Sequence, residues 1–215
     1  MIVVTGKQTV ELSELELEVI AARYEEMVID LGTGDGRFAL QYAREQPRTL
    51  VIGIDPVAET MSELAGRARR KRGRQDNLLY VVASAERPPP ELRGRADRLF
   101  IILPWGSLMR GLILGAPDVL SGIAALCTPG CAITALLNTR IFSDPIPLEA
   151  QDLPELSSTY VANELQTRYA AHGLELASVG DLAPEALLEL PSTWAKRLSH
   201  RNPPPTLQLE LQRRG

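Results

Sequence analysis

The chain has 215 residues, of which 45% are apolar, and a formal net charge of −4 at pH 7. Its length suits one domain spanning residues 1–215 with one substantial core, and its charge argues weakly against binding polyanions over the whole surface. A secretory leader pattern and an apolar run approaching ~20 residues are both missing, which argues against export and membrane spanning and predicts a cytoplasmic protein.

The N-terminal residues predict a hairpin followed by a helix. Residues 2–12 contain apolar positions around a turn at Gly6-Lys7, which favours a β-hairpin. Ser13 precedes Glu16 by three residues, the spacing of a capping box. We therefore expect a helix from this point to about Arg23.

Two buried strands are expected next, each leading into a helix. Residues 27–31 form a short apolar run that ends in a glycine cluster, after which a helix should extend to about Glu45. Residues 50–55 form the second run, and Pro56 suits the first turn of the helix that follows. The expected core stripe of that helix is Val57, Met61, Leu64, Ala65 and Ala68.

The rest of the chain continues the alternation of strands and helices, which indicates a parallel sheet covered on both faces. Further strands are expected at residues 78–82, 99–103 and 131–137. Residues 144–156 read as an irregular connection and residues 159–172 as a helix. Residues 174–179 and 206–211 favour an edge hairpin, joined by an excursion over residues 190–205.

Residues that could bind a metal are few. Cys127 and Cys131 lie in an apolar region without a nearby His or further Cys, so we interpret them as buried, reduced thiols. His172 reads as a helix-end residue, and His200 as a surface or RNA-side residue. Nothing in the sequence supports a metal site.

The run Asp30-Leu31-Gly32-Thr33-Gly34-Asp35-Gly36 is the most informative motif. Its glycines let a strand turn sharply into a helix and let backbone amides approach a ligand. A dinucleotide fingerprint would need glycine where Arg37 stands. The spacing instead resembles motif I of class I S-adenosylmethionine (SAM) dependent methyltransferases. The resemblance implies a Rossmann-like α/β fold with a seven-stranded sheet whose last strand is antiparallel, here with an N-terminal β-hairpin.

Two acidic strand ends support this resemblance. It implies that Asp55 accepts hydrogen bonds from the ribose hydroxyls of SAM, and that Asp30 engages the methionine amino end, directly or through water. Ala85-Glu86 follows the third strand, where the family contacts the adenine ring. The structural alternative is that Asp30 and Asp55 only cap the following helices. We favour the cofactor interpretation because the two acidic strand ends and the glycine run occur together.

The two tryptophans of the chain stand in separate segments. Trp105, in LPWGSL, follows the strand at residues 99–103, and ligands on open α/β sheets lie outside the carboxyl ends of the strands. Trp194 lies in the 190–205 excursion. Two aromatic planes could hold one base, each stack contributing ~1 to 3 kcal/mol and offsetting base extrusion. The alternatives are a core tryptophan for Trp105 and a surface-loop anchor for Trp194.

In this order, the segments DLGTGDG, GIDP, ASAE, LPWGSL and STWAKRL, with the N-terminal GK hairpin, resemble the aminoglycoside-resistance 16S rRNA methyltransferases that modify N1 of adenine 1408. The resemblance covers essentially the full length. It implies that Trp105 and Trp194 are the catalytic pair, which sandwich the flipped adenine, while Ser107 and Ser192 line the cofactor pocket. The residues expected to bind SAM, and to release S-adenosylhomocysteine, are Asp30, Gly32, Gly34, Gly36, Asp55, Pro56, Ala85, Glu86, Ile102, Ser107 and Ser192.

The expected partner is 16S rRNA within the assembled 30S subunit, with no DNA or membrane partner, and a monomer suits so large a substrate. Phosphate contacts are expected from two basic patches and should make binding strongly salt-dependent. The alternative for the first patch is a solvated helix end. Linkers at residues 140–158 and 190–205 are expected on the substrate side. The patches comprise Arg67, Arg70, Lys71 and Arg74, at helical spacing if the helix persists, and Lys196, Arg197 and Arg201.

Two other functions remain open at this stage. The first is a SAM-dependent methyltransferase that acts on another RNA site or on a small planar acceptor. The second is a SAM-binding protein that docks on the 30S subunit with weak or no activity, because the proline-rich residues 199–205 are shorter and less basic than the corresponding family segment.

Overall fold

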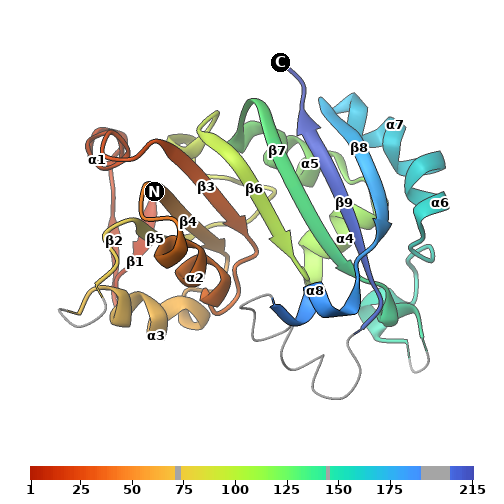
Figure 1. The fold of residues 1–215 in the computed structure, drawn as a ribbon, viewed down its shortest axis with the longest axis horizontal. Helices are drawn as coiled ribbons and strands as arrows, with labels where there is room; N and C mark the ends of the chain where they lie inside the picture. The colour runs from red at the N-terminus through yellow and green to blue at the C-terminus, as the bar shows by residue number, and fades with distance from the viewer. Residues whose placement is uncertain (71–73, 144–145, 190–203) are drawn as a thin grey trace.

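A computed structural model describes residues 1–70, 74–143, 146–189 and 204–215. In these residues one mixed sheet has the strand order β2-β1-β5-β4-β3-β6-β7-β9-β8 (Figure 1). The strands are β1 Ile2–Val4, β2 Thr9–Glu11, β3 Glu26–Leu31, β4 Thr49–Asp55, β5 Leu78–Val82, β6 Ala96–Ile102, β7 Cys127–Asn138, β8 Leu174–Asp181 and β9 Thr206–Arg213.

The helices occupy the connections between these strands. The α-helices are α1 Glu14–Ala21, α2 Arg37–Glu45, α3 Ala58–Ala68, α4 Gly106–Leu114, α5 Pro117–Leu126, α6 Ser158–Tyr160, α7 Gln166–Ala171 and α8 Pro184–Glu189. A π-helical turn, Val161–Leu165, joins α6 to α7, so the expected helix at residues 159–172 is confirmed as one continuous run. Short 3-10 turns are Pro90–Leu92, Thr139–Phe142 and Leu148–Ala150.

The sheet topology places a crevice at its centre. The strands β5, β4, β3, β6 and β7 are parallel, whereas β9 is antiparallel to both β7 and β8. This confirms the expected seven-stranded sheet, which the antiparallel β1–β2 hairpin extends at the β5 edge. From β3 the chain moves outward to β4 and β5 and then returns to β6 on the other side of β3. Ligands bind where the strand order reverses in this way, outside the carboxyl ends of the strands.

Helices cover the sheet on both faces. On one face, α2 and α3 bury Ala39, Leu40, Met61 and Leu64 against residues of β4 and β5, including Tyr80. On the other, α1, α4, α5 and α7 pack in one larger cluster against the opposite side of the sheet. Figure 1 shows α2 and α3 in front of the sheet and α4 and α5 behind it. Central parallel strands are covered on both sides, which explains why β4 is buried from Thr49 to Ile54.

The capping box at α1 is present as expected. The amide of Glu16 donates to Ser13 Oγ at 3.3 Å, and the amide of Ser13 donates to Glu16 Oε2 at 2.8 Å. At the other end of the chain, His172 is the C-cap of α7, which confirms it as a helix-end residue. Cys127 and Cys131 are buried free thiols, also as expected.

The boundaries of α3 differ from the sequence-based expectation. The helix begins at Ala58, because the Asp55 carboxylate accepts a hydrogen bond from the amide of Val57 at 2.9 Å and holds the preceding turn. Pro56 therefore lies before the helix, and Val57 is its exposed N-cap instead of a core residue. The other four stripe residues are buried. The helix ends at Ala68, whose carbonyl accepts from the amide of Gln75 at 2.8 Å and closes the following loop.

No single helix in the described ranges is long and apolar enough to cross a membrane. The helices α4 and α5 would reach that length and composition only as a pair, and they are bent by 101°.

Candidate functional site

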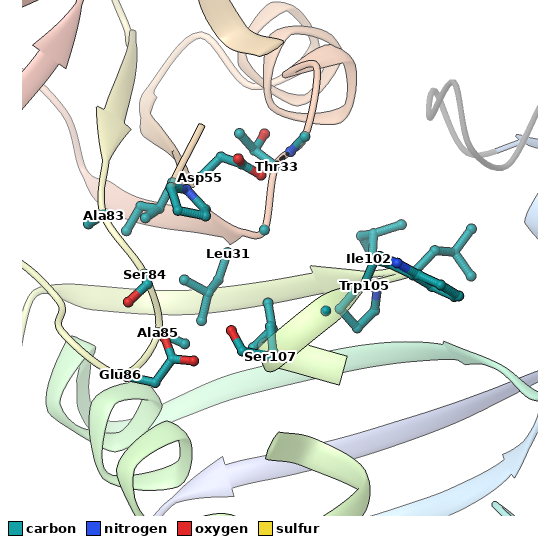
Figure 2. Close-up of a pocket in the computed structure, with 18 of the residues that line it drawn as sticks. Leu31, Thr33, Asp55, Ala83, Ser84, Ala85, Glu86, Ile102, Trp105 and Ser107 are labelled. Atoms are coloured by element: carbon teal, nitrogen blue, oxygen red, sulfur yellow. Dashed lines mark hydrogen bonds between the residues drawn. The ribbon is translucent and has the colours of Figure 1, made fainter. Parts of the chain in front are cut away.

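A pocket of about 300 Å³ opens at the carboxyl ends of β3, β4, β5 and β6, where the topology predicts a ligand (Figure 2). Four chain segments form its wall: the glycine turn after β3, the end of β4, the loop after β5 and the turn after β6. The lining residues are Leu31, Gly32, Thr33, Gly34, Asp35, Ile54, Asp55, Pro56, Ala83, Ser84, Ala85, Glu86, Ile102, Leu103, Pro104, Trp105, Gly106, Ser107 and Leu108.

The glycine turn brings backbone close to the pocket. The amides of Gly32 and Thr33 both donate to the carbonyl of Ile54, at 2.8 and 2.9 Å, and hold the turn against the end of β4. Gly32 has a φ of +77°, and a Cβ there would lie 2.8 Å from Leu108 of α4. Gly34 has a φ of +58° and nothing within 4 Å of a Cβ position, so its surroundings are open. These conformations explain two of the motif glycines.

Asp55 presents a carboxylate at the pocket wall. Its two carboxylate oxygens accept from the amides of Gly34 at 3.0 Å and Val57 at 2.9 Å, and the residue lines the pocket. Burial raises the pKa of Asp55, and the hydrogen bonds from these amides act in the opposite direction. An ionised carboxylate has about four acceptor positions, so about two remain for a ligand. Asp55 therefore both holds the turn that precedes α3 and lines the pocket.

Asp30 lies behind the pocket wall. It is 1% exposed and does not line the pocket. Its carboxylate instead accepts a hydrogen bond from Thr33 Oγ1, and Thr33 lines the pocket in its place. Burial raises the pKa of Asp30 to about 7, although the Thr33 hydrogen bond lowers it. Asp30 thus supports the wall from behind.

Gly36 also lies outside the pocket lining, for a packing reason. Its carbonyl accepts from Tyr80 Oη at 2.6 Å, and a Cβ at this position would lie 2.3 Å from the Tyr80 ring. With a φ of +78°, Gly36 is the N-cap of α2. The last glycine of the motif therefore serves helix α2 and its contact with β5.

The loop after β5 forms the opposite wall. Ala85 is buried, and its carbonyl oxygen packs so closely on α5 that a Cβ at Gly122 would lie 1.7 Å away. Burial raises the pKa of Glu86, but hydrogen bonds from the hydroxyls of Ser107 and Ser84 outweigh this and lower it. Figure 2 shows Ser107 and Glu86 next to one another. Ser107 thus joins the loop after β5 to the start of α4.

The turn after β6 holds Trp105 at the pocket. Leu103 has a φ of +50° although it is not glycine and precedes a proline. A left-handed residue of this kind costs about 1–3 kcal/mol and persists only where the surroundings impose it. Its amide donates to the carbonyl of Leu136 at 2.9 Å. Trp105 is the N-cap of α4 and is 48% exposed, so the alternative of a core tryptophan is wrong.

Helix α4, which follows Trp105, is fixed at its other end. The carbonyls of its last turn, which lack partners within the helix, accept hydrogen bonds from Tyr160 Oη at 3.0 Å, Tyr169 Oη at 2.8 Å and Arg168 Nη1 at 2.7 Å. In addition, Arg110 of α4 forms a bidentate pair with Asp152 in the segment between β7 and α6, at 2.7 and 2.8 Å. The helix that presents Trp105 is therefore held by residues from several segments.

The first basic patch is not a helical stripe. Arg67 lies in the last turn of α3, 3.7 Å from Glu63, whereas Arg70 lies beyond the helix end. Arg74 pairs with Asp76 at 2.6 Å. The expected helical spacing is wrong beyond Ala68, because the chain turns into a loop there. Six further expected residues lie outside the described part of the chain: Lys71, Ser192, Trp194, Lys196, Arg197 and Arg201.

Several lining residues were missed by the sequence analysis. Most are immediate neighbours of expected residues at strand ends. Their position next to those residues is the sequence feature that could have identified them. Gly122 does not line the pocket but contacts the loop that does. No sequence pattern predicts this contact, because only the fold brings α5 against the loop after β5. The missed lining residues are Leu31, Thr33, Asp35, Ile54, Ala83, Ser84, Leu103, Pro104, Gly106 and Leu108. No cluster of three or more potential metal ligands occurs in the described ranges.

Comparisons with known proteins identify the family of the chain. The family model described as NpmA, 16S rRNA (adenine(1408)-N(1))-methyltransferase, matches residues 2–212. A curated protein of that name from Streptoalloteichus hindustanus is 37% identical over 198 residues, 91% of each chain. One from Escherichia coli is 33% identical over 202 residues, covering 93% of this chain and 92% of its own length.

Solved structures give the same result. A tryptophan-to-alanine variant of the 16S rRNA (adenine(1408)-N(1))-methyltransferase from Catenulisporales acidiphilia, with cosubstrate SAM, is 38% identical and has a TM-score of 0.94. That match covers 100% of this chain and 97% of the other. The 16S rRNA methyltransferase KamB is 36% identical with a TM-score of 0.91, and both chains are covered completely.

Proposed function

The chain belongs to the 16S rRNA (adenine(1408)-N(1))-methyltransferase family, and from this membership we propose that it methylates N1 of adenine 1408 in the assembled 30S subunit. It is a SAM-dependent methyltransferase. We propose a planar acceptor because Trp105 is half-exposed at the wall of the cofactor pocket. An aromatic plane in this position can orient a flipped base.

The described residues fit SAM. When bound, SAM supplies a sulfonium methyl group for an in-line displacement. Asp55 has acceptor positions left for the two ribose hydroxyls, and the loop at Ala85 and Glu86 bounds the pocket where we place the adenine ring. Ile102 and Ser107 contribute to the same lining. Gly32 and Gly34 keep the turn after β3 compact enough for a ligand to approach the backbone.

Asp30 acts in this proposal through Thr33 and not by direct contact. Because Thr33 Oγ1 donates to the buried Asp30 carboxylate, the threonine is held in the pocket wall close to the glycine turn. Gly36 likewise contributes indirectly, by allowing α2 to start against Tyr80.

Positioning supplies the rate enhancement in this mechanism. Adenine N1 has an in-plane lone pair, so no general base would be required. The bond from N1 to the methyl carbon would form as the methyl–sulfur bond breaks, with S-adenosylhomocysteine as the leaving group, and the cationic product ring could lose its excess proton to solvent. Trp105 stacks on one face of the base and Trp194 on the other. Correct alignment of two reactants can account for several powers of ten in rate.

We assign Arg67, Arg70 and Arg74, together with the basic residues around Trp194, to phosphate contacts with the 30S subunit. We also propose that the linkers at residues 140–158 and 190–205 contribute to substrate binding. The enzyme acts as a monomer in the cytoplasm, where 30S subunits are found, and the methylated base interferes with aminoglycoside binding at the decoding site.

The test is methyl transfer by the Trp105→Ala variant. We expect its SAM affinity to be retained and its product on 30S subunits to be lost, because Trp105 contacts the base and not the ribose. Unchanged turnover would contradict the proposed role of Trp105. Activity of the wild type on naked RNA or on small heteroaromatic compounds, but not on 30S subunits, would favour a different acceptor. Binding of SAM and 30S without methylation would indicate a docking protein.

A further inference from the structure

A small apolar cluster connects the turn before Trp105 with helix α8. Its buried members are Ile102 and Leu103 at the end of β6, Leu136 of β7 and Leu187 of α8. Figure 1 shows α8 at the carboxyl end of β6, the end of the sheet that holds the pocket. The cluster is separate from the two larger clusters that stabilise the faces of the sheet.

Leu187 is the residue through which α8 is docked. It is 0% exposed, whereas Pro184 and Glu185 are exposed and Ala186 is half-buried. Among the α8 side chains that the structure describes, Leu187 is therefore the buried anchor. Leu187 does not line the pocket, so it can be altered without removing a pocket contact.

The partner of this anchor is the strained turn. Leu103 adopts its left-handed conformation with its side chain 8% exposed in the same cluster, and its amide bonded to Leu136. Packing around Leu103 is therefore what holds the backbone that leads, two residues later, to Trp105. In the other direction, the chain after α8 reaches Trp194 seven residues beyond Leu187.

We propose that Leu187 is a positioning residue for methyl transfer. It fixes helix α8, after which the chain continues to Trp194, against the turn that aims Trp105. The expected effect of Leu187 on methyl transfer rests on the proposed function. Its expected effect on the packing of α8 and the Leu103 turn does not. Removal of the Leu187 side chain should loosen α8 and the Leu103 turn together, and leave the SAM-binding wall at Asp55 and Ala85 in place.

The experiment compares Leu187→Ala with Leu64→Ala, which removes the same type of buried side chain from the separate cluster under α3. We expect Leu187→Ala to lower kcat on 30S subunits by about tenfold to a hundredfold, the range that a displacement of about 1 Å produces. The Kd for SAM should change much less than kcat, because Asp55 and Ala85 lie outside the Leu187 cluster. Leu64→Ala should lower thermal stability without this change in kcat. Leu187→Met should restore most of the activity because it refills the cluster.

A second readout does not depend on methylation. In a Trp194→Phe background, the fluorescence of Trp105 should show lower steady-state anisotropy with Leu187→Ala and no change with Leu64→Ala. Equal effects of the two substitutions on anisotropy, or no effect of Leu187→Ala, would overturn the inference. If the anisotropy falls as expected but wild-type enzyme does not methylate adenine 1408, the anchor is supported and the proposed function fails.

Discussion

Replacing Gly122 with alanine tests how the pocket wall after β5 is held. A Cβ at this position would lie 1.7 Å from the carbonyl oxygen of Ala85. An ordinary carbon–oxygen contact is about 3.3 Å, so α5 or the loop has to move by about 1.6 Å. Overpacking of this kind costs about 1–3 kcal/mol, whereas alanine in place of glycine inside a helix contributes about 1 kcal/mol in the stabilising direction.

We therefore expect Gly122→Ala to destabilise the protein by up to about 2 kcal/mol and to show none of the gain that helix propensity alone would give. Because the displaced loop contains Ala85 and Glu86, SAM binding should also weaken. Urea denaturation and titration calorimetry with SAM measure the two effects. Gly180→Ala is the matched control, since Gly180 has nothing within 4 Å of a Cβ position and no left-handed φ. If Gly122→Ala is as stable as the control and binds SAM as the wild type does, the close contact does not hold the wall.

Three further predictions concern charged residues. Burial raises the pKa of Asp30 from 3.8 to about 7. Between these pH values the carboxyl group is ionised in the unfolded chain but still protonated in the native protein. The free energy of unfolding therefore falls as the pH rises from about 4 to about 7. Asparagine does not ionise, so the stability of Asp30→Asn relative to wild type should increase between about pH 4 and about pH 7, as measured by urea denaturation. A stability difference between the two proteins that does not change with pH would refute this. Asp55→Asn should weaken SAM binding about tenfold or more in calorimetry, and an unchanged Kd would remove Asp55 from the ribose site. Arg67→Gln with Arg70→Gln should reduce the slope of log K for 30S binding against log salt by about one to two; an unaltered slope would place both residues away from phosphate.

Local sequence signals predicted the framework of the fold well. The capping box at Ser13, the buried runs that became β3 and β4, and the edge hairpin of β8 and β9 each depend on short-range patterns of charge or hydropathy. The end of α3 was missed because the basic residues after Ala68 are compatible with a helix. The backbone hydrogen bond from Gln75 to Ala68 that closes the loop is not visible in the sequence.

The candidate site was predicted less completely, because motif positions do not reveal side-chain direction. Asp55 and the loop at Ala85 reached the pocket as expected. The Asp30 carboxylate accepts a hydrogen bond from Thr33, and the Gly36 carbonyl accepts one from Tyr80. Neither residue lines the pocket. Their roles in binding SAM stay predictions until the variants are measured.

Primer extension across the decoding region of 30S subunits incubated with the protein and SAM tests the central claim most directly, because methylation at N1 blocks Watson–Crick pairing. We predict a stop at adenine 1408 that disappears with Trp105→Ala and with Trp194→Ala while SAM binding persists. The absence of a stop with wild-type protein that binds SAM would contradict the proposed activity.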